Sequence, residues 1–77
     1  MLRLRNIMIH DHIAEADFYP EDSQSKGHIV VNLASGEIES LEEVDGYSGM
    51  YPAHAYSTLL KMANEKDTKT ERLVMWY

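Results

Sequence analysis

The chain has 77 residues, no cysteine and a formal net charge of -6. A chain of this length holds one core and buries only about 60% of the surface that its unfolded form exposes. Without cysteine it has no disulfide framework or thiolate metal site, which favours the cytoplasm. Thirteen acidic residues against seven basic ones repel phosphate backbones, so no nucleic acid is expected as a partner.

The N-terminal region has basic residues, but its apolar stretch is interrupted at His10, Asp11 and His12. That stretch is too short for a signal-peptide core or a membrane span, so no membrane association is expected. Within residues 1–6, Leu2 and Leu4 alternate with Arg3 and Arg5, so this segment fits either a disordered tail or an extra edge strand. Met8 is an alternative start of the protein.

The segment from Ile7 to Tyr19 is rich in β-branched and aromatic residues, and it is predicted to form a first strand. Pro20 ends this strand. Residues 21–27 are polar and close with a glycine, which indicates a long connecting loop.

The clearest strand runs from His28 to Leu33, where Ile29 and Val31 alternate with more polar positions. The alternating residues, Leu33 included, are predicted to face the core. Residues 34–36 are Ala-Ser-Gly and fit a three-residue hairpin turn, whose glycine takes a positive φ.

A third strand is predicted from Glu37 to about Glu43, with Ile38 facing inward. Its density of carboxylates is typical of a solvated or edge strand. These acidic side chains also suit a divalent cation or a basic partner, but they lack the glycine and ligand spacing of a calcium loop.

A helix is predicted from Pro52, whose fixed φ suits the first helical position. Tyr56, Leu59, Leu60 and Ala63 follow at the spacing i, i+3, i+4 and i+7 and form one apolar stripe. This stripe is expected to cover the sheet.

The segment from Glu71 to Tyr77 alternates again and is predicted to be the last strand. The resulting order is β-β-β-α-β over a single domain, residues 1–77. The predicted fold class is α+β, with an antiparallel meander of three strands, one helix packed on one face and a final C-terminal strand.

Three apolar residues, Val30, Val74 and Trp76, are assigned to the sheet face that the helix leaves open. In so small a chain they need cover, either from the N-terminal segment or from a second subunit. The expected partner is therefore a second copy in a homodimer. Arg72 shares this strand face with Trp76 and is predicted to stack on it at a protein interface.

His10 and His12 are two residues apart, a spacing that lets two imidazoles on one strand face bind the same ion. A stable metal centre needs three or four protein ligands, and no spacing in the sequence fixes Asp11, His28 or His54 as the others. Structural or solvent-exposed histidines are the preferred interpretation, and no metal or cofactor is assigned.

Aromatic and imidazole side chains gather where the predicted helix begins, at Tyr47, Met50, Tyr51, His54 and Tyr56. Next to the free N–H groups of a helix start they suit a small-ligand pocket, in which His54 would be a neutral base. The alternative is a satellite hydrophobic cluster with its tyrosine hydroxyls in water. No nucleophile elbow, phosphate loop or metal motif frames these residues.

Three stretches, Lys26–Ile38, Tyr51–Ala55 and Glu71–Tyr77, resemble short uncharacterised bacterial proteins that have no assigned function. The resemblance implies a bacterial cytoplasmic origin. It carries no catalytic or binding residues.

The sequence thus favours a non-catalytic protein-interaction module that self-associates and that can bind another protein. The alternative is a small-ligand or metal-dependent enzyme with a site at the loop–helix junction around Tyr51 and His54. The candidate binding residues are Tyr47, Tyr51, His54, Trp76 and Arg72, and no catalytic residue is assigned.

Overall fold

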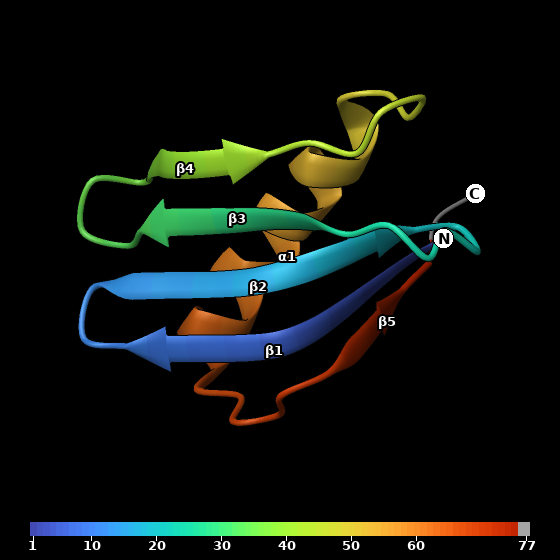
Figure 1. Ribbon diagram of the computed structural model, residues 1–77. Helices are drawn as coiled ribbons and strands as arrows, with labels where there is room; N and C mark the ends of the chain where they lie inside the picture. Colours follow the sequence, from blue (N-terminus) through green and yellow to red (C-terminus); the bar gives the residue numbers. More distant parts are fainter. Residues whose placement is uncertain (76–77) are drawn as a thin grey trace.

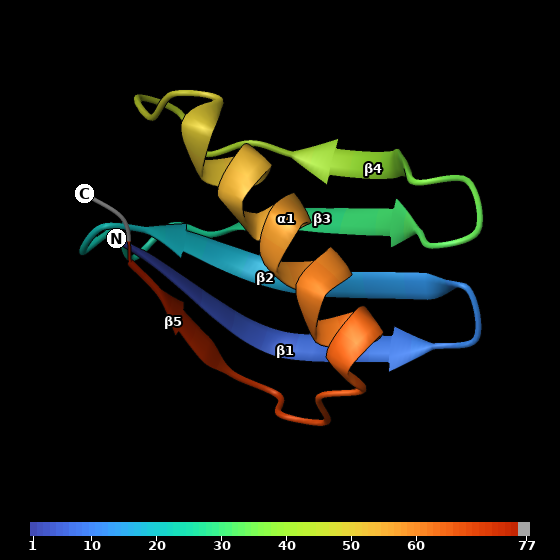
Figure 2. The ribbon, with the colours of Figure 1, turned by 180° about the vertical axis from the view of Figure 1, so that it is seen from behind.

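The computed structural model of the chain describes residues 1–75. Within them lie β1 (Leu2–His10), β2 (Ile13–Pro20), β3 (Gly27–Asn32), β4 (Glu37–Glu42), α1 (Met50–Glu65) and β5 (Arg72–Val74). The strands form one antiparallel sheet in the order β4-β3-β2-β1-β5. The helix crosses one face of this sheet, as Figures 1 and 2 show from opposite sides. The predicted α+β class, with its meander, single covering helix and C-terminal strand, is confirmed.

The segment predicted as a single first strand is a β-hairpin of two strands. β1 and β2 are joined by a tight turn at Asp11 and His12, and Asp11 has a positive φ of 54°. Aspartate tolerates this conformation better than most residues, so the chain turns here without glycine or proline. Because β1 begins at Leu2, the N-terminal segment is a strand. It lies between β2 and β5 and not at the edge of the sheet.

β5 presents its two faces the other way round from the prediction. Val74 is paired with Leu2, which is fully buried under the helix, and Val74 itself packs against the core. Leu73 points to the opposite side and is 53% exposed. Both alternating sets in this strand are apolar, so the sequence pattern does not say which set faces inward. Trp76 and Tyr77 lie outside the described residues.

The core lies between α1 and the three strands in front of it, β1, β2 and β3. The predicted inward residues Ile29 and Val31 are fully buried, and Leu33 packs against the core from the turn. On the helix the fully buried side chains are Ala55, Leu59 and Met62, with Pro52 buried in the first turn. The buried face of the helix is therefore rotated slightly from the predicted stripe. Leu59 is common to both, while the predicted members Tyr56 and Leu60 are only partly buried.

β4 forms one edge of the sheet and is exposed along its whole length, as its carboxylates predicted. Ile38 is paired with Val31 and shares its face, yet Ile38 is 44% exposed because the helix packs mainly over β1, β2 and β3. The preceding turn contains Gly36 with the predicted positive φ, 77°. No helix in the described part of the chain has the length and apolar character needed to cross a membrane.

Candidate functional site

The predicted cluster at the start of α1 forms in part. The rings of Tyr47 and Tyr51 meet edge to face with centroids 5.4 Å apart. The Tyr51 hydroxyl donates a hydrogen bond of 2.8 Å to the carboxylate of Glu21, in the loop after β2. The amino group of Met1 donates to the same oxygen at 2.8 Å. These contacts join three segments of the chain.

The electrostatics of this cluster keep Tyr51 a hydrogen-bond donor. Its hydrogen bond to Glu21 raises the pKa of Tyr51, so the phenol stays protonated at neutral pH. The amino group of Met1 and the Tyr51 hydroxyl together lower the pKa of Glu21, which stays ionised. The hydrogen bond between Tyr51 and Glu21 therefore holds the loop after β2 against the start of α1. With Tyr51 protonated and the pKa of Glu21 lowered, neither group is suited to act as a general base.

The remaining residues of the predicted site are divided between two places. His54 is half-buried one turn along the helix from Tyr51. Arg72 instead donates a 3.4 Å hydrogen bond to Asp67, just beyond the other end of α1. A helix of 16 residues is about 24 Å long, so Arg72 is not part of the tyrosine cluster. Trp76 was predicted to stack on Arg72 and lies outside the described residues.

The two histidines of the N-terminal region do not share a strand face. His10 ends β1 and His12 lies in the turn that follows. The ring of His10 approaches the carboxylate of Asp11 at 3.2 Å, and both groups are exposed. Among residues 1–75, no group of three histidine, aspartate or glutamate side chains is placed to hold a metal ion.

The strongest polar cluster lies on the sheet face opposite the helix and is centred on Asp17 of β2. Asp17 is only 5% exposed. Its Oδ1 is 2.7 Å from Nδ1 of His28, while its Oδ2 accepts from Asn6 at 2.8 Å and from Lys26 at 3.3 Å. A buried carboxylate needs such partners, because an unpaired charge away from water is costly.

These partners decide the charge state of the buried carboxyl. Burial by itself raises the pKa of Asp17, but the hydrogen bonds from Asn6, His28 and Lys26 outweigh it and hold the pKa below its ordinary value. Asn6 reaches the carboxylate from an irregular point in β1, where the register shifts and its φ is 53°. The bulge therefore serves to aim the amide at Asp17.

The Asp17 cluster was not predicted from the sequence. Its members come from β1, β2, β3 and the loop before β3, and only the strand register brings them together. The available signal was an acidic residue between Ala16 and Phe18, in a strand whose remaining residues, apart from Glu15, are apolar or aromatic. An acidic residue in such a strand is expected either on an exposed face or with partners.

A row of ionisable side chains crosses the open face through this cluster. The register pairs Arg5 with Asp17, Asp17 with His28 and His28 with Glu42. Side chains of paired residues lie on the same side of a sheet, so these four stand side by side across β1, β2, β3 and β4. We call Arg5, Asp17, His28 and Glu42 the charged row.

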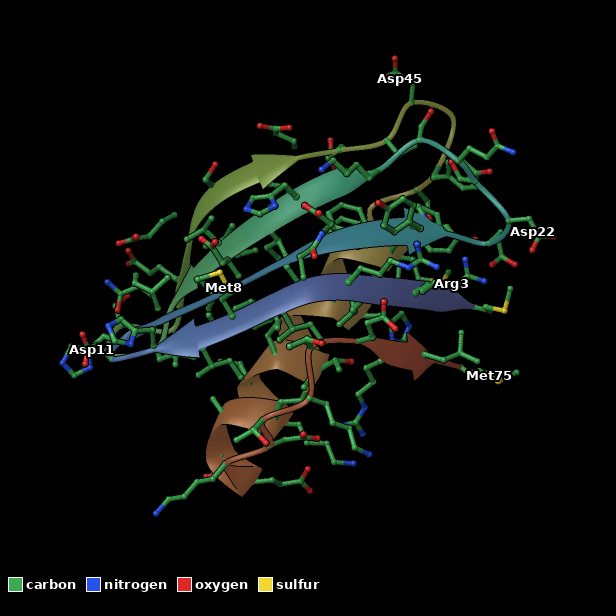
Figure 3. The ribbon with its side chains drawn as sticks, turned by 60° about the horizontal axis from the view of Figure 1, so that its bottom comes forward. Arg3, Met8, Asp11, Asp22, Asp45 and Met75 are labelled. Carbon is green, nitrogen blue, oxygen red and sulfur yellow. The ribbon has the colours of Figure 1, made fainter. Side chains whose placement is uncertain are left out.

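Apolar side chains accompany the charged row on the same face. Met8 of β1 is 58% exposed, Val30 of β3 is half-buried, and Leu73 lies on β5. Figure 3 shows Arg3 and Met8 projecting from β1 on the side away from the helix. Of the apolar residues predicted on the open face, Val30 is there and Val74 is not, since Val74 packs under the helix.

No family model, curated protein or solved structure matches this chain.

Proposed function

We propose that this chain is a non-catalytic protein-interaction module that forms a homodimer by packing two open sheet faces together. The observation that carries the proposal is the charged row, because reversing its order places the cation Arg5 opposite the carboxylate of Glu42, and the carboxylate of Asp17 opposite an imidazole. From β1 to β4 it reads cation, carboxylate, imidazole, carboxylate.

A twofold axis parallel to the strands, between β2 and β3, exchanges β1 with β4 and β2 with β3. Because such an axis preserves position along the strands, Arg5 of one subunit lies opposite Glu42 of the partner subunit, and Asp17 lies opposite an imidazole. Each contact then occurs twice, as in any isologous interface. The exposed outer pairs supply specificity, while the inner Asp17 is held within its own subunit.

A second row supports the same arrangement. The register joins His10 to Ile13, Ile13 to Asn32 and Asn32 to Glu37. The same axis brings His10 opposite the partner's Glu37. The sheet edge at β4 is a poorer interface for two copies, because β4–β4 pairing would bring its carboxylates close to one another.

The size of the face sets the expected strength of the dimer. Four strands about 4.8 Å apart, each about six residues long, cover roughly 20 by 20 Å. Two such faces amount to roughly 800 Å² of flat area, which is smaller than the roughly 1,200 Å² at which stable specific interfaces begin. We therefore expect a dissociation constant in the micromolar range and a reversible monomer–dimer equilibrium.

The shifted pKa values fit binding better than catalysis. Asp17 and Tyr51 are both committed to hydrogen bonds, one as an ionised acceptor and the other as a protonated donor. A general base needs a pKa near the working pH, whereas Asp17 is shifted below its ordinary value and Tyr51 above it.

Sedimentation equilibrium over a wide concentration range tests the proposal, using the wild type, Val30→Glu and a control, Met50→Glu. Val30 lies in the middle of the open face, whereas Met50 is 49% exposed at the start of α1. We expect the wild type and M50E to dimerise alike, also in the presence of a chelator, and V30E to remain monomeric. A wild type that stays monomeric up to millimolar concentration, or V30E association equal to that of the wild type, would refute the proposal.

A further inference from the structure

The edge of β1 is free along its second half. β5 pairs with β1 only at Leu2–Leu4, and the amide of Ile7 then donates to the carbonyl of Thr70 at 2.9 Å. Within residues 1–75, no strand continues this pairing along Met8–His10.

The backbone of Ile9 points out of this free edge. The two-residue turn makes His10 and Ile13 the hydrogen-bonded pair that closes the hairpin. Backbone groups alternate in direction along a strand, so the N–H and C=O of Ile9 point away from β2. No backbone hydrogen bond joins Ile9 to another described residue on that side.

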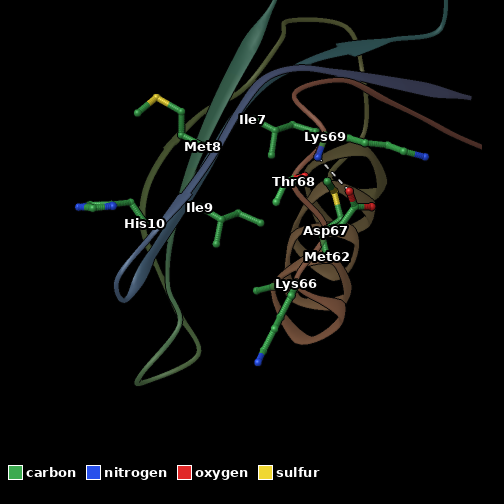
Figure 4. Close-up of a pocket in the computed structure, with 10 residues that line it drawn as sticks. Ile7, Met8, Ile9, His10, Met62, Lys66, Asp67, Thr68 and Lys69 are labelled. Carbon is green, nitrogen blue, oxygen red and sulfur yellow. Dashed lines mark hydrogen bonds between the residues drawn. The ribbon is translucent and has the colours of Figure 1, made fainter.

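A groove lies directly beside this edge, with a volume of about 540 Å³. Ile7 and Ile9 form one wall, Met62 and Ala63 form the apolar floor, and Lys66–Lys69 form the other wall. Figure 4 shows Ile7 and Ile9 turned toward Met62 and Thr68, while Met8 and His10 turn to the opposite side of the strand. We call this space the edge groove.

The far wall of the edge groove is basic in an otherwise acidic chain. Lys66 and Lys69 are both exposed, and neither forms an ion pair with another described residue. Asp67 lies between them, but its carboxylate is paired with Arg72 at 3.4 Å. The uncompensated charge beside the groove is therefore positive.

We propose that the edge groove binds an extended, acidic segment of a partner protein, which adds to β1 as a short antiparallel strand in line with β5. Its backbone hydrogen-bonds to Ile9, an aliphatic side chain enters the space between Ile9 and the half-buried Ala63, and flanking carboxylates meet Lys66 and Lys69. Such strand addition obtains affinity from the backbone and specificity from alternate side chains. A small apolar molecule would fill the same space but would leave the Ile9 backbone groups unsatisfied. The groove opens on the helix side of β1, although two of its lining residues, Met8 and His10, turn their side chains to the open face of the proposed dimer.

The test uses a fluorescein-labelled peptide, Glu-Val-Glu-Val-Glu-Val, with fluorescence anisotropy and amide chemical-shift mapping on the full chain. Two control peptides are the lysine counterpart and the acidic peptide with both inner valines N-methylated, which removes backbone donors. The protein variants are Lys66→Glu combined with Lys69→Glu, and Lys61→Glu as the matched control. Lys61 is exposed on α1 and does not line the groove.

The acidic peptide is expected to bind, with shifts concentrated at Ile7–His10 and Lys66–Lys69. The double variant should weaken binding about tenfold and K61E by less than about twofold, since charge contacts act locally in salt. Absence of binding at millimolar peptide, equal binding of the N-methylated peptide, or shifts elsewhere would overturn the proposal. Sedimentation equilibrium of the Lys66→Glu, Lys69→Glu variant distinguishes the edge groove from the dimer interface on the open face. We expect this variant to self-associate as the wild type does. Loss of self-association would show that a second copy fills the groove, which also overturns the proposal.

Discussion

The two faces of the sheet are made by the same strands and differ in almost every physical property. On β2, Ala14, Ala16 and Phe18 point under the helix and are buried against it. Their neighbours Glu15 and Asp17 point to the open side, where the charged row runs. One face thus holds the fold together by burying apolar surface, while the other carries the charged row, for which we propose a role in recognition. The comparison predicts that equal substitutions have unequal effects on the two faces.

The largest difference is expected for the same truncation on each face. Leu59→Ala removes a fully buried side chain of α1 and should lower the free energy of unfolding by about 2–5 kcal/mol. Leu73→Ala, on the open side of β5, should change it by less than about 0.5 kcal/mol. Urea denaturation of both variants measures the two values. Similar losses would show that the open face is as much a part of the core as the covered one.

A smaller effect is expected at the buried carboxylate, where the open face contributes to stability. Asp17→Asn keeps the shape but removes the charge that Lys26 and His28 meet, and should cost about 1.5–3 kcal/mol at pH 7. The depressed pKa of Asp17 means that its stabilisation is complete above the ordinary aspartate pKa and is lost as the pH falls through the lower folded value.

The gap in unfolding free energy between the wild type and D17N should therefore narrow in acid, as the pH falls below the ordinary aspartate pKa of 3.8 and through the lower folded value. Urea titrations at several pH values follow it. A gap that does not narrow in acid would mean that the charge of Asp17 is not what stabilises the cluster.

The next effect is expected at Gly27, whose backbone lies close to Phe18 on the sheet face that the helix covers. A Cβ added at Gly27 would collide with the ring of Phe18 and with the backbone carbonyl of Glu42. Gly27→Ala should therefore cost about 1–3 kcal/mol through overpacking. Gly49→Ala, where an added Cβ meets nothing within 4 Å, should change stability by less than about 1 kcal/mol. Equal thermal shifts of the two variants would contradict this account of Gly27.

Sequence reasoning succeeded where the signal was local. The alternation around Ile29 and Val31, the turn glycine at Gly36 and the helical spacing through Leu59 each follow from a few neighbouring residues. It failed at the turn of Asp11, where neither glycine nor proline marks the change of direction. It also assigned Val74 to the wrong face, because both sides of that strand are apolar.

The candidate sites show the same limit. The predicted cluster at the helix start depends on residues close in sequence, and the structure brings two of its members, Tyr47 and Tyr51, together. The charged row and the Asp17 cluster depend on the register of four strands, and this register cannot be predicted from patterns of neighbouring residues. The edge groove exists because β5 is short, a property of packing at the end of α1 that no sequence pattern gives.

The most direct test of the central claim exchanges charges in the charged row and measures self-association by sedimentation equilibrium. Arg5→Glu alone and Glu42→Arg alone each place like charges opposite one another, and each should weaken the dimer about tenfold. An equimolar mixture of the two variants restores both opposite-charge contacts in a heterodimer, so the mixture should associate about as strongly as the wild type. A mixture that associates no better than either variant alone would contradict the twofold packing of the open faces.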